Sequence, residues 1–126
     1  MDNTDRKNMD TIDREKIEKI IRDRKQAHNF YNDNSPVYRT FTQMEKAAFA
    51  EGELSKGQKE LIAIGISIVI NCESCLEWHI KQALDAGVAR EQIIEAIGVG
   101  IEMGGGPATV SSRFAMKVLS YYTSPG

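Results

Sequence analysis

The feature that most constrains the fold is an isoleucine-rich run at residues 62–70. Isoleucine stands at every second position there, in the order Ile-Ala-Ile-Gly-Ile-Ser-Ile-Val-Ile. Alternation with period two is typical of a β-strand. However, Ser55 and Gln58 form a capping box that begins a helix before the run, and the chain has no second strand-like run. Because a lone strand cannot satisfy its backbone N–H and C=O groups, we predict a buried helix, apolar nearly all round.

The other segments carry helical patterns of similar length. A short amphipathic helix is predicted over about residues 12–25, where isoleucines recur at helical spacing. Further helices are predicted over about residues 72–86 and 90–103, each followed by glycine, and a last helix begins at Pro107. The sequence therefore predicts an all-α protein of five to six short helices.

The segment that follows Ser35 shows the clearest helix start in the chain. Ser35 is suited to be the N-cap, and Pro36 to be the first helical residue. Apolar residues then recur at steps of four, three and four: Val37, Phe41, Met44 and Ala48. This spacing predicts that one stripe of the helix is buried.

Composition limits the class of protein. The 126 residues suffice for one domain, and 16 basic against 18 acidic side chains give a net charge of −2. A near-neutral chain lacks the basic surface that binds nucleic acid, and no run reaches the ~18 apolar residues of a membrane span. Since the N-terminus also lacks a signal-peptide apolar region, we expect a cytoplasmic protein. We divide the chain into a charged segment with a short helix at 1–29 and a helical domain at 30–126.

The candidate catalytic residues in the sequence are Cys72, Cys75 and His79. Steps of three and four place the three side chains on one helical face. Cys72 stands near the helix N-terminus, where the dipole favours a thiolate, and an imidazole one turn beyond Cys75 can accept the proton of that thiol. Two cysteines three positions apart can also close a disulfide, which gives an attacking and a resolving thiol.

Three other readings of these residues stay open at this stage. The cysteines could be inert core residues, since free cysteine often fills apolar cores. They could bind zinc with His79, although the fourth ligand would have to be a carboxylate, because His28 lies in the distant polar segment. They could also belong to a thioredoxin-like fold, but the flanking segments look helical. Glu77 and Trp78 are interpreted as surface and packing residues rather than as chemistry.

A longer pattern surrounds these residues. The stretch 58–79, QKELIAIGISIVINCESCLEWH, resembles the alkylhydroperoxidase D-like branch of the carboxymuconolactone decarboxylase family. The resemblance continues through 83–88 and 90–95, and it closes at 103–108, Met-Gly-Gly-Gly-Pro-Ala. It covers about residues 36–120 and implies an all-α helical domain that forms homotrimers or homohexamers.

The resemblance also implies a function and a role for each site residue. It implies a thiol-dependent peroxidase of antioxidant defence, an enzyme that reduces alkyl hydroperoxides without a cofactor or metal and is regenerated by a dithiol protein reductant. Cys75 would be the peroxidatic cysteine and Cys72 the resolving one. Glu60, twelve residues before Cys72, would relay the proton together with His79. The residues themselves agree for Cys75, whereas the helix dipole alone would favour Cys72.

One departure from the family pattern motivates a second hypothesis. Many relatives carry His or Tyr in the second position between the cysteines, where this chain has Ser74, preceded by Glu73. A carboxylate beside the thiols would raise their pKa. The alternative is therefore a dithiol–disulfide redox partner or sensor with little peroxidase turnover. A further alternative is lactone decarboxylation, which in the family does not rely on the cysteine pair.

Overall fold

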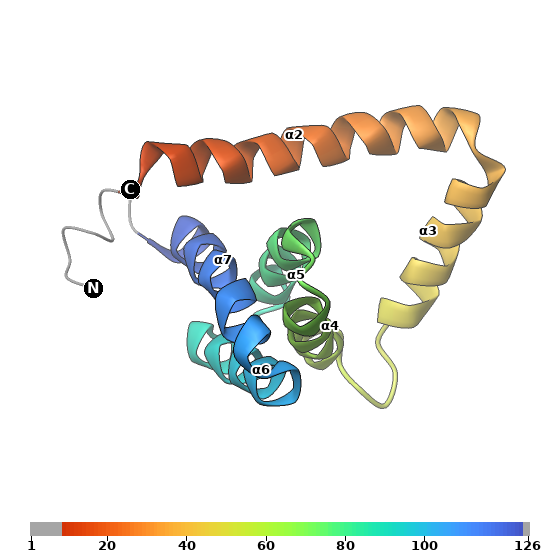
Figure 1. Ribbon diagram of the computed structural model, residues 1–126. Coiled ribbons are helices and arrows are strands. Elements are labelled where there is room, and N and C mark those ends of the chain that lie inside the picture. Colours follow the sequence, from red (N-terminus) through yellow and green to blue (C-terminus); the bar gives the residue numbers. More distant parts are fainter. Residues whose placement is uncertain (1–8, 125–126) are drawn as a thin grey trace.

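The computed structural model of the protein describes residues 9–124, and in that range all regular structure is helical (Figure 1). This confirms the all-α prediction, and the isoleucine-rich run does lie in a helix rather than in a strand. None of the described helices is long and apolar enough to cross a membrane. The helices are α2 (Thr11–Asn34), α3 (Pro36–Phe49), α4 (Lys56–Ile70), α5 (Glu73–Asp85), α6 (Arg90–Gly104) and α7 (Gly106–Thr123).

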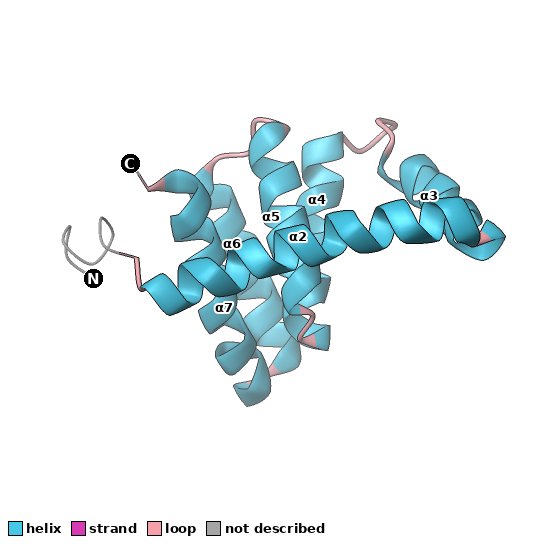
Figure 2. Ribbon diagram, turned by 90° about the horizontal axis from the view of Figure 1, so that it is seen from above, coloured by secondary structure: helices cyan, strands magenta, loops and turns pink. Residues whose placement is uncertain are grey.

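Helices α4 to α7 form the body of the molecule, and α2 and α3 form an arm. Figure 2 shows α2 lying across the ribbons of the body, so that one long helix spans several of the shorter ones. At its far end the chain turns, and α3 runs back toward the start of α4, standing apart from the body (Figure 1). Residues of this arm and of α4 and α5 together line one cavity.

Helix α4 begins where the sequence predicts. The hydroxyl of Ser55 accepts a hydrogen bond from the backbone N–H of Gln58, and the side chain of Gln58 accepts one from the N–H of Ser55. The isoleucines that point into the body, Ile64 and Ile68, are fully buried. The outward ones are not, because Ile62, Ile66 and Ile70 are 52–62% exposed within this chain. The helix is therefore predicted correctly, while its burial on all sides is wrong for the single chain.

Gly100 on α6 allows a close approach of α4 and α6. A Cβ atom on Gly100 would lie 2.8 Å from the carbonyl oxygen of Gly65 and 2.9 Å from the Cβ of Ile68. Such separations are shorter than van der Waals contact, so any side chain at Gly100 would push the two helices apart. Helix α4 also carries Glu60 and leads into the cysteine pair.

The predicted burial of the α3 stripe is wrong. No residue of α3 is buried, and the exposed fractions of Val37, Phe41 and Met44 are 80%, 52% and 61%. The helix start is correct, since the Ser35 hydroxyl accepts a hydrogen bond from the backbone N–H of Tyr38. The spacing indicated an apolar face, but the arm holds that face away from the body.

Helix α2 is longer than the predicted 12–25, because it continues to Asn34. It ends where Ser35 takes an extended conformation in front of Pro36. A proline ring disfavours helical geometry in the residue before it, so the helix stops there and not earlier. The helix thus runs through residues 29 and 30, and residues 1–8 of the charged segment lie outside the described part of the chain.

Candidate active site

The cysteine pair lies at the turn between α4 and α5. Helix α4 ends at Asn71, which has a left-handed backbone conformation (φ 55°), and this turn makes Cys72 the N-cap of α5. Cys72 and Cys75 are joined by a disulfide, with their Cα atoms 5.2 Å apart. The backbone N–H of Cys75 also donates to Sγ of Cys72 at 3.2 Å. Because the two sulfurs are bonded to each other, the pair can alternate between dithiol and disulfide. Both cysteine residues are partly exposed, so a reactant can reach this turn.

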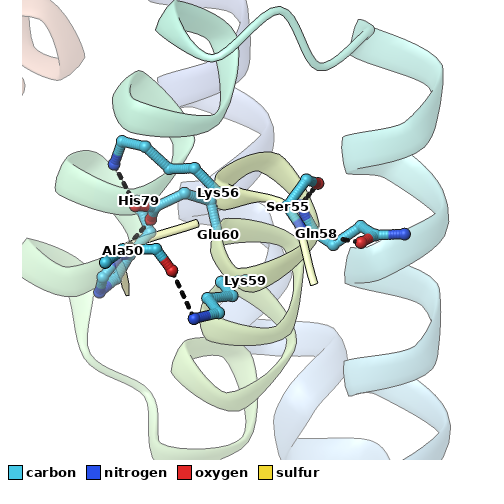
Figure 3. Close-up of polar contacts among 7 residues, drawn as sticks. All are labelled: Ala50, Ser55, Lys56, Gln58, Lys59, Glu60 and His79. Atoms are coloured by element: carbon cyan, nitrogen blue, oxygen red, sulfur yellow. Dashed lines mark hydrogen bonds and ion pairs between the residues drawn. The ribbon is translucent and has the colours of Figure 1, made fainter. Parts of the chain in front are cut away.

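Glu60 of α4 and His79 of α5 form a polar pair across the two helices (Figure 3). Nδ1 of His79 lies 2.7 Å from Oε1 of Glu60, although the two residues are nineteen positions apart. Glu60 is 2% exposed, and its second oxygen accepts a hydrogen bond from Nζ of Lys56 at 3.1 Å. His79 also follows Cys75 by one turn of α5. The structure thus brings together the histidine and the glutamate that the family resemblance implied.

Phe49, the last residue of α3, covers the histidine. Its ring stacks on that of His79, with centroids 5.3 Å apart and planes 23° from parallel. The contact excludes water from one face of the imidazole, and His79 is only 15% exposed. The end of the arm therefore forms part of the environment of the Glu60–His79 pair.

Glu73, the acidic residue between the cysteines, has a partner that sequence spacing could not reveal. Nζ of Lys16, on α2, lies 2.7 Å from Oε2 of Glu73. Both side chains are nearly half exposed, so solvent screens the pair and its contribution to stability is small. Even so, the ammonium group offsets the negative charge that would otherwise oppose thiolate formation next to the cysteines.

Glu77 is not the surface residue that we interpreted it to be. It is fully buried, and its carboxylate accepts hydrogen bonds from Arg24 of α2 and from the hydroxyl of Tyr122 of α7. Burial and the neighbouring Glu77 carboxylate raise the pKa of Tyr122 above its usual value. The Arg24 guanidinium also lies 4.8 Å from the centroid of the Trp78 ring. This cluster ties α2 to the helix that carries the cysteines.

Possible metal ligands are few in this region. Among the residues that the structure describes, no three His, Cys, Asp or Glu side chains are arranged to hold a metal ion. The two sulfurs are engaged with each other, and Glu60 engages His79 and Lys56. The arrangement instead suits chemistry in which two thiols exchange electrons and a nearby polar pair moves a proton.

Comparison with known proteins identifies the family to which the chain belongs. The sequence profile of the carboxymuconolactone decarboxylase family matches residues 35–117, more than half of the chain. The chain belongs to this family. It is similar to an uncharacterized protein of Cupriavidus necator, with 39% identity over 82 residues that cover 65% of this chain and 70% of that one. It is also similar to uncharacterized protein 4 of the cox locus of Paracoccus denitrificans, with 42% identity over 79 residues, 63% and 71% of the respective chains.

Solved structures of the family share the fold. A carboxymuconolactone decarboxylase family protein from Legionella pneumophila superposes with a TM-score of 0.79 at 27% identity, over 86% of this chain and 97% of that one. A family protein from Thermotoga maritima gives a TM-score of 0.76 at 23% identity, over 82% and 89% of the respective chains. The helical arrangement is therefore that of the family.

Proposed function

We propose that the protein is a thiol-dependent peroxidase that reduces organic hydroperoxides through the Cys72–Cys75 pair. The observation that carries the proposal is a disulfide at the N-terminus of α5, on the same helix as a histidine held by a buried glutamate. A thiol peroxidase needs two thiols that can close on one another and a group that accepts and returns a proton. Membership of the family, and the resemblance to its peroxidase branch, support the same assignment.

In the proposed reaction the dithiol form meets the hydroperoxide. His79, oriented by Glu60, accepts the proton of Cys75, and the thiolate attacks the O–O bond. An S–O bond forms, the O–O bond breaks, and the departing alkoxide takes a proton from the relay to become an alcohol. Cys75 is then a sulfenic acid. The thiol of Cys72 attacks that sulfur, the disulfide forms, and water leaves.

The disulfide state of the structure is the oxidised end of this cycle. Two thiols have given two electrons to the peroxide, so the cycle needs a dithiol reductant that returns them by disulfide exchange. We assign that role to a dithiol protein, and we assign the reaction to the cytoplasm, where thiols are kept reduced. The steps described use no flavin, haem or metal.

The test is to trap the sulfenic acid with a carbon nucleophile after one equivalent of hydroperoxide and to locate it by mass spectrometry. We expect adduct on Cys75 in the Cys72→Ser variant and none in the Cys75→Ser variant. Labelling of Cys72 in the Cys75→Ser variant instead would reverse the roles of the two cysteines. Absence of adduct in both variants, with the wild-type dithiol left unoxidised, would refute the peroxidase.

Steady-state turnover separates the peroxidase from a dithiol redox partner or sensor. With hydroperoxide and a dithiol reductant in excess, a peroxidase keeps consuming peroxide, whereas a sensor stops after about one equivalent. The pairing of Glu73 with Lys16 favours turnover, because it removes part of the charge that motivated the sensor hypothesis. Lactone decarboxylation that survives in the Cys72→Ser/Cys75→Ser variant would instead support the third function.

We also propose that the protein works as a homotrimer or homohexamer, as the resemblance implies. The outward side of α4 and the adjacent side of α6 form an exposed apolar face, lined by Ile62, Ile66, Ile70, Val99 and Met103. Apolar patches of this kind on one chain mark association sites. Sedimentation equilibrium should give three or six times the 14.1 kDa chain mass, and Ile66→Glu should dissociate the assembly. A monomeric wild type would disprove this part.

A further inference from the structure

A cavity of about 880 Å³ lies between the arm and helices α4 and α5. Four phenylalanine, tyrosine or tryptophan side chains form part of its walls. Tyr38, Phe41 and Phe49 come from α3, and Trp78 comes from α5. This volume is in the range of cavities that enclose small organic ligands, which typically have apolar walls and a few polar groups. The cavity also gives a role to part of the α3 stripe, because Phe41 faces this space rather than the core.

The cavity touches the proposed proton relay. Glu60 forms part of its wall, and so does Phe49, whose ring stacks on His79. Trp78 also lines it and directly precedes His79 on α5. A molecule bound here would therefore contact the residues that position the imidazole.

The charges around the cavity favour an anion. Two of its cations, Arg24 and Lys56, are engaged by the buried carboxylates Glu77 and Glu60. Two others, Lys25 and Lys46, take part in none of the ion pairs found within residues 9–124.

Glu45 is the only carboxylate of the described cavity wall that likewise forms none of those ion pairs. The cavity wall thus carries two unengaged cations and one unengaged anion. The cations are Lys25 of α2 and Lys46 of α3, and both residues are exposed. This rim suits a single carboxylate attached to an apolar body.

We propose that this cavity binds the substrate of the proposed peroxidase and that the substrate is an amphipathic hydroperoxide carrying a carboxylate. The apolar body lies against the aromatic walls, and the carboxylate faces Lys25 and Lys46. Neither cysteine lines the cavity, so the hydroperoxide end has to pass the wall where Glu60 and Phe49 contact His79, one turn of α5 from Cys75. The inference rests on the proposed function for the chemistry, but binding alone can be measured without it. An unoxidised carboxylate of the same shape should therefore bind as well.

Binding has a built-in probe, because Trp78 is the only tryptophan of the chain and lines the cavity. Octanoate titrated into the oxidised protein should change the tryptophan fluorescence with saturation, and it should bind more tightly than 1-octanol. In Lys25→Gln/Lys46→Gln we expect octanoate to bind about fivefold more weakly, at the scale of two exposed charge interactions, with 1-octanol unaffected. Equal octanoate affinity in wild type and variant would overturn the assignment of the carboxylate.

The matched control removes two exposed cations elsewhere. Arg22 of α2 and Arg113 of α7 line no part of the cavity, so Arg22→Gln/Arg113→Gln lowers the net charge equally and should leave octanoate affinity within about twofold. A loss as large as that of the lysine variant would mean that only the overall charge matters, which also overturns the site.

Measurements of turnover test whether the cavity serves the reaction. They also distinguish an error in the proposed binding site from an error in the proposed peroxidase activity. The wild type should reduce a fatty-acid hydroperoxide with a higher kcat/KM than the methyl ester of the same hydroperoxide, and Lys25→Gln/Lys46→Gln should lose that preference. Specific octanoate binding with no reduction of either compound would refute the peroxidase and keep the site. Equal reduction of acid and ester, with no fluorescence response to octanoate, would refute the site and keep the peroxidase.

Discussion

The cost of removing the buried Glu77 carboxylate follows directly from its contacts. The side chain is fully enclosed on α5 and accepts hydrogen bonds from Arg24 and Tyr122, so it joins α2, α5 and α7. Breaking a buried ion pair costs about 3–5 kcal/mol, because the remaining charge loses its partner. The Arg24 side chain is 25% exposed, so water recovers part of that loss. We expect Glu77→Ala to lower the free energy of unfolding by about 3 kcal/mol.

The Glu77→Gln variant isolates the charge from the shape. Glutamine keeps the side-chain volume and one acceptor oxygen, so we expect a loss of about 1.5–2 kcal/mol, the low end of the scale of hydrogen bonds to charged groups. The control is Asp23→Asn on α2, whose pair with Lys19 is more than half exposed and should contribute less than about 0.5 kcal/mol.

The assay is urea unfolding of the oxidised protein, followed by far-ultraviolet circular dichroism. All variants are compared at one protein concentration, because association contributes to apparent stability. Against a typical total stability of about 5–15 kcal/mol, the loss in Glu77→Ala should move the midpoint clearly at unchanged slope. If Glu77→Ala unfolds within about 1 kcal/mol of the wild type, the cluster does not hold α2 to the body and our reasoning is wrong.

Three further predictions concern other contacts. The pKa of Tyr122 is raised in the folded state, so just above pH ~10 this hydroxyl ionises only in the unfolded chain. The free energy of unfolding should therefore fall as pH rises in that range, and it should fall less steeply in Tyr122→Phe, as unfolding measured at several pH values would show. Gly100→Ala should destabilise by about 1–3 kcal/mol through overpacking, whereas Gly98→Ala, with open space around it, should stabilise by up to about 1 kcal/mol in the same unfolding assay. Lys16→Gln should lower the thiolate fraction of the reduced protein at neutral pH, measured by thiolate absorbance, and Lys16→Gln/Glu73→Gln should restore it; equal fractions in all three proteins would contradict the pairing.

Much of the fold could be predicted because its signals are local. Ser55 with Gln58 begins α4, and glycine or asparagine at helix ends marks the turns, so helix existence follows from caps and spacing. The end of α2 was missed although the signal was present. The same Ser35–Pro36 step that begins α3 also stops α2, since the residue before a proline leaves helical geometry. Apolar isoleucines mark where a helix packs, not where it ends.

Burial was harder to predict than helicity. An apolar stripe shows that a face prefers apolar surroundings, but it does not say whether the same chain supplies them. Phe41 faces a cavity and Val37 faces outward, so the α3 stripe is correct as a pattern and wrong as a core. Likewise, three of the five isoleucines in 62–70 point away from the body.

The site divides in the same way into local and distant parts. Cys72, Cys75 and His79 follow from spacing on one helix, whereas no local pattern could place Glu60 beside His79, and only the family resemblance indicated it. Glu77 had a usable signal, because Ile80 and Leu84 follow it at three and seven positions and so share its side of the helix. A carboxylate on an apolar face needs a buried partner, and a search for one would have pointed to a distant cation.

That distant cation belongs to α2, the most polar of the described helices, and three cations of this helix contact different parts of the site. Lys16 pairs with Glu73 between the cysteines, Arg24 holds Glu77, and Lys25 stands on the rim of the cavity. Balanced charge predicted a solvated face, and most of α2 is indeed exposed, yet these three cations act on different properties. Substitutions along one helix should therefore separate into changes of thiolate fraction, of unfolding free energy and of ligand affinity, because each cation contacts a different part of the site.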